Sequence, residues 1–323
     1  MTINTPDLAV SISGLNKTYA ASSGEPPKTA LTNVSLKIPR GSFFGLLGPN
    51  GAGKSTIINI MAGLVIKSSG SVKIWGYDIE KEMRQARSAI GIVPQELNID
   101  PFFTPREILD VQAGLYGVPK SQRRTMEILE AVHLSDKAEA YARTLSGGMR
   151  RRLLVAKAMV HTPPVLVLDE PTAGVDVELR QQLWSYIRHL RDKGTTILLT
   201  THYLEEAEEL CDQIAIINKG EVVTCQPTEE LLRSLDHKEF IITVNEELTE
   251  VPESLSRFKV ELQNKHMLVF RVPPSQVPVE DLLQAVQAVG LTIRDLTTKE
   301  SDLEDIFLMM TQGSEKAMPS PYV

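Results

Sequence analysis

The chain has 323 residues, of which 42% are hydrophobic and 23% charged, and its formal net charge is −7. This composition excludes a disordered chain, and the acidic balance argues against nucleic acid as the main partner. Two cysteines are too few for a disulfide framework or a zinc site. This low cysteine count fits a reducing compartment. No run approaches the roughly 20 apolar residues that span a bilayer, and no secretory signal pattern is found at the N-terminus.

The N-terminal part of the chain predicts strands that lead into a phosphate-binding loop. Alternating apolar residues predict strands at 10–12 and 34–38, separated by a Ser-, Gly- and Pro-rich surface loop at 20–28. An apolar run at 43–47 then precedes a complete G-x-x-x-x-G-K-[ST] pattern, and 57–61 continues as a helix. Because a strand, a glycine loop and a helix are the context of a P-loop, we expect this loop to bind nucleotide phosphates. The loop comprises Gly48, Pro49, Asn50, Gly51, Ala52, Gly53, Lys54, Ser55 and Thr56.

A second glycine loop, Leu145–Met149, follows a stretch at 96–145 whose pattern is helical and punctuated by prolines. Its Ser146, Gly147 and Gly148 open a further helix, where a hydroxyl and backbone N–H groups at a positive dipole end suit an anion. The chain therefore has two places to hold phosphate, but only the first carries a lysine. The simplest resolution is that two chains share each nucleotide.

A basic run, Arg150–Arg152, follows this loop, with Lys157 beyond it. The pattern is typical of the solvated face of a helix, which we favour over a nucleic-acid contact. We therefore expect no nucleic-acid partner.

Three apolar strands are predicted further along the chain, at 165–168, 197–200 and 214–217. The unbroken hydrophobicity of the first is typical of a parallel strand buried on both faces. A helix at 178–191 lies between the first two strands and gives a βαβ unit. The Lys-Gly-Glu sequence at 219–221 predicts a hairpin turn.

Two carboxylates, Asp169 and Glu170, stand where the first of these strands ends. Such a pair often belongs to an ordinary loop, but beside a P-loop we favour a functional interpretation. Asp169 would hold Mg²⁺ or its water, together with the Ser55 hydroxyl, and Glu170 would orient and deprotonate the attacking water. Lys54 would supply the cation of the phosphate cradle.

Three further residues are candidates for the same site. His202 ends the strand next to that of Glu170, where a contact with the γ-phosphate is favoured over a general-base role. Gln95 follows the apolar segment Ile92–Pro94 and could reach the Mg²⁺ site, although an ordinary polar loop residue explains it equally well. Tyr19 could stack on adenine, with a rim aromatic of a strand as the equal alternative.

The part of the chain after about residue 235 predicts a small α+β domain. The composition changes there, and no chemical motif is found. Expected strands and helices alternate up to a helix at 302–311, capped by Ser301, and the tail is expected to be disordered. The expected strands are 240–244, 258–262, 268–272 and 291–296, and the other helix is 279–289.

In their order, these motifs resemble the ATP-binding subunits of ABC transporters, over residues of about 10 to 230. The resemblance implies an α/β P-loop NTPase fold, with a RecA-like core, an antiparallel β subdomain and a helical subdomain, plus a small C-terminal α+β domain. It places the cassette at 8–232, its helical subdomain at about 96–148, the accessory domain at 236–312 and a flexible tail at 313–323. The matching motifs are Tyr19, the Walker A loop 48–56, the Q-loop Gln95, the signature LSGGM at 145–149, the Walker B strand VLVLDE at 165–170, the D-loop Gly174-Val175-Asp176 and the switch His202.

The resemblance also implies roles for single residues. Two cassettes meet head to tail, and each ATP lies between one Walker A loop and the partner's signature serine and glycines. Glu170 is then the general base, His202 the γ-phosphate sensor and Asp176 the coupling residue across the dimer. Asp169 and Gln95, with Ser55, surround the Mg²⁺.

Three sequence segments, PTAGVD, TTHYLEEAEELCD and SDLEDIF, are similar to those of the export branch of that family. This implies an ATPase that powers a separate multi-span permease from the cytoplasmic face of the bacterial inner membrane. Two alternatives remain, a soluble ABC ATPase acting on ribosomes or DNA and a regulatory module that holds ATP without turnover.

Overall fold

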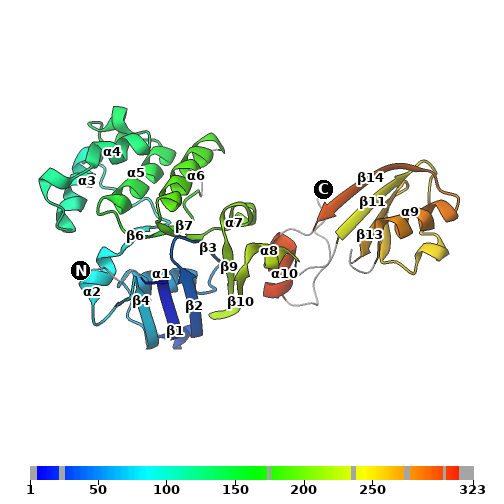
Figure 1. Ribbon diagram of the computed structural model, residues 1–323, viewed down its shortest axis with the longest axis horizontal. Coiled ribbons are helices and arrows are strands. Elements are labelled where there is room, and N and C mark those ends of the chain that lie inside the picture. Colours follow the sequence, from blue (N-terminus) through cyan, green and yellow to red (C-terminus); the bar gives the residue numbers. More distant parts are fainter. Residues whose placement is uncertain are drawn as a thin grey trace. The chain divides into compact units, whose positions relative to one another are not determined.

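The computed structural model describes residues 6–21, 26–172, 175, 177–233, 238–272, 277–300 and 303–312. Its contacts divide the chain into two compact units, Met1–Thr228 and Glu229–Val323, which are drawn in Figure 1. The boundaries expected from the sequence for the cassette and for the accessory domain stay predictions.

The first unit begins with an antiparallel sheet whose strand order is β2-β1-β4-β5. The expected strands at 10–12 and 34–38 are confirmed, and each is part of a longer one. Val10 and Ile12 pair with Ile38 and Leu36, and all four side chains are buried on one face. Strands β4 and β5 were not predicted, because only two residues of β4 are buried and β5 has only two residues. The bounds are β1 Leu8–Tyr19, β2 Lys28–Pro39, β4 Ser69–Ile74 and β5 Tyr77–Asp78.

A second sheet of six strands, in the order β10-β9-β3-β8-β7-β6, forms the centre of the unit. Five strands are parallel, and β10 returns antiparallel to β9 through the expected hairpin at 219–221. The βαβ unit is confirmed as β7, α6 and β8. Because parallel strands end at one edge, the segments after β3, β6, β7 and β8 meet there. The strands are β3 Phe43–Leu47, β6 Ile90–Val93, β7 Val165–Asp169, β8 Thr196–Thr200, β9 Gln213–Asn218 and β10 Glu221–Pro227, and the helices are α1 Lys54–Met61, α2 Met83–Ser88, α6 Val177–Asp192 and α7 Leu204–Leu210.

Residues between β6 and β7 form the expected helical part, which has a core of its own around Leu109, Leu129 and Leu153. A capping box starts α3, where Thr104 Oγ1 accepts from the Glu107 backbone and the Glu107 carboxylate accepts from the Thr104 backbone. The helices are α3 Pro105–Leu115, α4 Thr125–Ala131 and α5 Gly147–Met159, with short 3-10 turns at Lys120–Gln122, Ser135–Lys137 and Ala142–Thr144.

The expectation that the Arg150–Arg152 run forms a solvated helix face is wrong. Arg151 and Arg152 are only 4% and 7% exposed. The Arg152 guanidinium donates to the carbonyl oxygens of Val132 and His133, at 2.8 and 3.2 Å, and so joins α5 to the end of α4. Carbonyls at the ends of neighbouring segments therefore replace water around these cations.

The second unit, described by itself, contains a four-stranded antiparallel sheet in the order β12-β13-β11-β14. Phe240 and Phe270 of the sheet pack with Leu282 and Val286 of α9 in one buried cluster, which confirms the α+β class. The strand expected at 291–296 continues to Glu300, while Ser301 and the tail after 312 lie outside the described residues. The elements are α8 Thr228–Arg233, β11 Lys238–Val244, a 3-10 turn at Glu253–Leu255, β12 Val260–Asn264, β13 Met267–Val272, α9 Val279–Ala288, β14 Ile293–Glu300 and α10 Leu303–Gln312.

Candidate functional site

The glycine loop of the P-loop pattern lies between β3 and α1, in the expected context. Gly48 begins the loop, and a Cβ at this position would lie 2.3 Å from the Ile217 carbonyl oxygen on β9. Only glycine permits this approach, which seats the loop directly on the sheet. Gly53 is the N-cap residue of α1, and the last three residues of the loop pattern open this helix. The loop therefore presents backbone N–H groups and a helix N-terminus at the carboxyl edge of the sheet.

Lys54 opens α1 and is 8% exposed. Its ammonium donates to the carbonyl oxygens of Gly48 and Pro49, at 2.5 and 3.2 Å. Burial lowers the pKa of Lys54, and the nearby charges of Glu170 and Asp169 oppose this shift. The loop thus holds a desolvated cation over its own backbone, opposite two carboxylates.

The β9–β10 hairpin braces the outer side of the loop. The Gly220 backbone N–H donates to the Ala52 carbonyl oxygen, and its own carbonyl accepts from Thr32, both at 2.9 Å. Gly220 has φ +81°, and a Cβ there would lie 2.6 Å from the Ala30 carbonyl oxygen. The hairpin, the P-loop and the start of β2 are therefore joined through one glycine backbone.

Thr200 binds both acidic residues at the end of β7, Asp169 through its carboxylate and Glu170 through its backbone. Its hydroxyl donates to Asp169 Oδ1 at 2.5 Å, and the Glu170 N–H donates to the Thr200 carbonyl oxygen at 3.0 Å. Glu170 has φ +48°, a left-handed conformation that non-glycine residues seldom adopt. The backbone of Glu170 is thereby turned out of the strand direction and held by the neighbouring strand. Sequence reasoning missed this role of Thr200, although a hydroxyl closing an apolar strand beside β7 was a signal.

Glu170 meets two of the other candidates. Its Oε2 accepts from Gln95 Nε2 at 3.0 Å and lies 3.3 Å from His202 Nδ1. The Glu170 side chain is 13% exposed and that of His202 is 51% exposed. The three side chains come from the ends of β6, β7 and β8, as the parallel order predicts. A carboxylate held between an amide and an imidazole is oriented to accept a proton.

Arg151 fixes the Gln95 backbone from behind. Its Nη1 donates to the carbonyl oxygens of Pro94 and Gln95, at 2.9 and 2.8 Å. Burial lowers the pKa of Arg151, and the charges of Asp169 and Glu170 oppose this shift. The residue was missed because its partners lie 56 and 57 residues away, and its interruption of the buried side of α5 was the only signal.

A cavity of about 480 Å³ opens over the P-loop. Tyr19, Lys54, Gln95 and Glu170 all line it, and Ser55 and Lys219 lie on its wall. Lys17 Nζ lies 4.6 Å from the Tyr19 ring centroid, so a cation covers one face of that ring. The cavity thus combines an aromatic wall, a phosphate loop and a carboxylate.

The signature residues lie elsewhere. The Ser146 hydroxyl caps α5 and accepts from the Met149 N–H at 3.2 Å, while Ser146 and Gly147 are exposed and Gly148 is buried. None of the three belongs to the wall of the P-loop cavity described above. Asp176 and Gly174 of the expected D-loop lie outside the described residues.

Asp169→Asn is expected to stabilise the nucleotide-free protein. Burial raises the pKa of Asp169 above its ordinary value of 3.8. The folded chain therefore binds this proton more tightly than the unfolded chain, so the stabilisation is complete below pH 3.8 and is lost as pH rises through the folded pKa. At pH 7 the charged form destabilises the fold, and its removal should raise the thermal midpoint by about 2 °C. Paired melts with the unsubstituted chain at pH 7 and pH 4 test this, and a lower midpoint at pH 7 would contradict it.

These features correspond to a known family. The family model described as ABC transporter matches residues 31–173. The chain belongs to the ATP-binding subunits of ABC transporters, and it is an ATP-binding ATPase of that family.

Its relatives include exporter subunits. The chain is 35% identical over 306 residues to a Nod factor export ATP-binding protein I of Ralstonia nicotianae, covering 94% of this chain and 93% of the relative. It is 37% identical over 294 residues to the linearmycin resistance ATP-binding protein LnrL of Bacillus subtilis, covering 88% and 94%.

Solved structures agree on the fold. An ATP-binding subunit of an ABC transporter superposes with a TM-score of 0.63 at 27% identity, over 70% of this chain and 92% of that chain. A dimeric post-hydrolysis state of the cassette MJ0796 with ADP and Pi gives a TM-score of 0.61 at 28% identity, over 68% and 98%. The expected P-loop NTPase fold is therefore confirmed. Among the described residues, the helices are all too short or too polar to cross a membrane.

Proposed function

We propose that this chain is the ATP-hydrolysing subunit of an exporter, acting with a separate permease at the cytoplasmic face of the bacterial inner membrane. The export names of the relatives support the direction of transport. The observation that carries the hydrolytic part is Glu170, held between Gln95 and His202 beside the P-loop lysine. The transported compound is selected by the permease.

In the proposed reaction, Glu170 removes a proton from the water that attacks the γ-phosphate. Its fixed backbone and its two polar partners orient one carboxylate oxygen for this task. Lys54 leaves the carbonyls of its own loop and contacts the β- and γ-phosphates, and His202 contacts the γ-phosphate. Tyr19 stacks on adenine, with Lys17 behind its ring.

The donors around the cavity fit Mg²⁺. The Ser55 hydroxyl, the Asp169 carboxylate and the Gln95 amide oxygen are hard oxygen ligands, which this ion prefers. Within the described ranges, no group of three or more His, Cys, Asp and Glu side chains could hold a metal ion. This suits an ion that is bound by one carboxylate together with nucleotide phosphates. When bound, Mg²⁺ would neutralise charge on those phosphates.

The position of the signature loop supports a composite site formed by two chains. Ser146 and Gly147 are exposed at the N-terminus of a 13-residue helix and lie outside the cavity of their own chain. We propose that Ser146 and Gly147, together with Gly148, bind the γ-phosphate of ATP held by a second copy of the chain. Asp176 would couple the two ATP sites. ATP binding closes this dimer, and hydrolysis reopens it.

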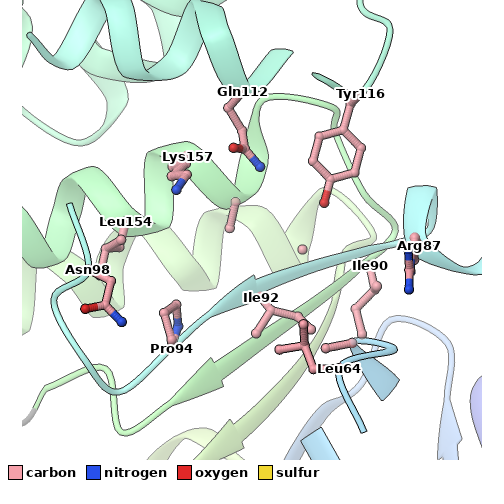
Figure 2. Close-up of a pocket in the computed structure, with 13 residues that line it drawn as sticks. Leu64, Arg87, Ile90, Ile92, Pro94, Asn98, Gln112, Tyr116, Leu154 and Lys157 are labelled. Carbon is pink, nitrogen blue, oxygen red and sulfur yellow. The ribbon is translucent and has the colours of Figure 1, made fainter. Parts of the chain in front are cut away.

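A groove between β6 and the helical part is proposed as the seat of a permease helix. Figure 2 shows Gln112 of α3 near Lys157 of α5, and Tyr116, which directly follows α3, above Ile90 of β6. The groove encloses about 460 Å³ and adjoins a second hollow of about 760 Å³ that shares Arg87, Gln112 and Tyr116. The residues lining the two hollows include three cations and no carboxylate. An amphipathic helix with an apolar ridge and an acidic side chain complements this surface.

The groove adjoins the catalytic site through consecutive residues. Pro94 lines the groove, and Gln95 lines the nucleotide cavity. Arg151 binds the carbonyl oxygens of both. A helix pressing on the groove would therefore act on the residue that contacts Glu170.

Leu115→Glu is expected to weaken association with the permease strongly. Leu115 is 77% exposed and lines the second hollow, so a carboxylate there costs little folding free energy but opposes an apolar, acidic partner. The chain is co-expressed with a candidate multi-span permease, and the two are co-purified in detergent. Recovery of the permease should fall at least tenfold.

The matched control is Met126→Glu, which adds the same charge at another exposed apolar residue of the helical part, on α4. It should retain the permease. Equal recovery with both variants would overturn the docking surface. Recovery of ribosomes or DNA in place of a membrane protein would favour a soluble ABC ATPase.

A further inference from the structure

A buried carboxylate, Glu206, lies in the first unit next to the chain segments that follow β7 and β8. It belongs to the first turn of α7 and is 6% exposed. Its Oε2 accepts from the Thr172 hydroxyl at 3.0 Å and from the Thr201 hydroxyl at 2.9 Å. Its Oε1 accepts from Trp184 Nε1 at 3.4 Å and lies 3.6 Å from Arg180 Nε.

The two hydroxyls belong to the segments that carry the catalytic groups. Thr172 follows Glu170 by two residues, and Thr201 directly precedes His202. Both donate to the same oxygen of Glu206, so a shift of one segment against the other lengthens one of these bonds. The Thr201 hydroxyl also accepts from the Tyr203 N–H at 3.0 Å, which directs its own proton toward Glu206.

A second connection reaches the His202 ring. Arg180, opposite Glu206, lies over the Tyr203 ring with its guanidinium carbon 4.7 Å from the centroid. The Tyr203 and His202 rings are 4.0 Å apart between centroids. Glu206 is therefore connected to His202 in two ways, through the backbone at Thr201 and through the stacked side chains of Arg180 and Tyr203.

We propose that Glu206 is a positioning residue for ATP hydrolysis, which fixes His202 relative to Glu170 without touching nucleotide. A buried carboxylate with four donors around it is costly to desolvate, and an apolar residue would pack there more cheaply. What the carboxylate adds is a common acceptor for the ends of two strands. The inference rests on the roles proposed above for Glu170 and His202.

The test is Glu206→Gln, which keeps the shape and turns one acceptor into a donor. In one amide orientation the NH₂ faces two hydroxyl donors, and in the other it faces Trp184 and Arg180. We expect kcat to fall about 10- to 100-fold through misplacement of His202, with ATP affinity within about twofold because the P-loop makes none of these bonds. Glu205→Gln, exposed on the same helix turn, should behave as the unsubstituted chain.

A double-substitution cycle separates positioning from simple packing. In a His202→Ala background, Glu206→Gln should add less than about a twofold further loss, because the group it positions is gone. Full multiplication of the two losses would overturn the proposal, as would a kcat per folded molecule equal to that of the unsubstituted chain. Thr201→Val, which removes one donor at nearly constant shape, should give a smaller loss of the same kind. Failure of the general-base role would instead appear as undiminished hydrolysis in Glu170→Gln, which the cycle does not involve.

Discussion

Glu170→Gln is expected to bind ATP normally and to hydrolyse it about 100- to 10,000-fold more slowly. Glutamine occupies the same space but accepts no proton from water. The substitution also removes a negative charge from beside the γ-phosphate, so the closed dimer should persist. Phosphate release measures the first effect. Light scattering of the eluting species with ATP and Mg²⁺ measures the second, as a shift from monomer to dimer.

A suitable control is Glu209→Gln, since that side chain is 70% exposed and pairs only with Arg188 among the ion pairs of the described residues. It should hydrolyse ATP at the unsubstituted rate. If Glu170→Gln stays monomeric in ATP, or keeps more than a tenth of the activity, the mechanism of closure and general-base hydrolysis is wrong.

Arg151→Met is expected to have the second largest effect, on both stability and turnover. The substitution leaves the Pro94 and Gln95 carbonyl oxygens without their donor and removes a buried cation that faces Asp169 and Glu170. The free energy of unfolding should fall by about 2–4 kcal/mol. Because the Gln95 side chain loses its backbone anchor, turnover should fall roughly tenfold or more.

Chemical denaturation and steady-state hydrolysis check these two effects. Arg150→Met is the matched control, since it removes the same group one position earlier, where a single bond to the Arg143 carbonyl is lost. It should cost less than about 1 kcal/mol. Similar losses of unfolding free energy and turnover in the two variants would mean that the bonds from Arg151 to Pro94 and Gln95 contribute no more than the single bond of Arg150.

The parts of the site that are local in sequence were predictable. The P-loop is a contiguous pattern flanked by an apolar strand and a helix, so its fold follows from neighbouring residues. The meeting of Gln95, Glu170 and His202 follows from a parallel sheet, because each ends a strand and parallel strands end together.

The parts of the structure that depend on residues far apart in the sequence could not be predicted. The side chains of Arg151 and Arg152 were expected in water, because a charged run on a helix usually lies there, and carbonyls far along the chain hold them inside. Strand β4 has only two buried residues and owes its existence to pairing with β1. In the sequence, Thr200 is an ordinary strand residue, and its bond to Asp169 depends on the pairing of β8 with β7.

The brace at Gly220 sets a lower limit on an autonomous ATP-binding fragment. The segment matched by the family model ends at residue 173, before β8 and the β9–β10 hairpin. Such a fragment would keep every residue of the Walker motifs, yet it would lack the Ile217 carbonyl on which Gly48 rests and the N–H that holds Ala52. We therefore expect nucleotide binding to need a chain that extends past Gly220, so truncations of this protein should begin beyond that residue.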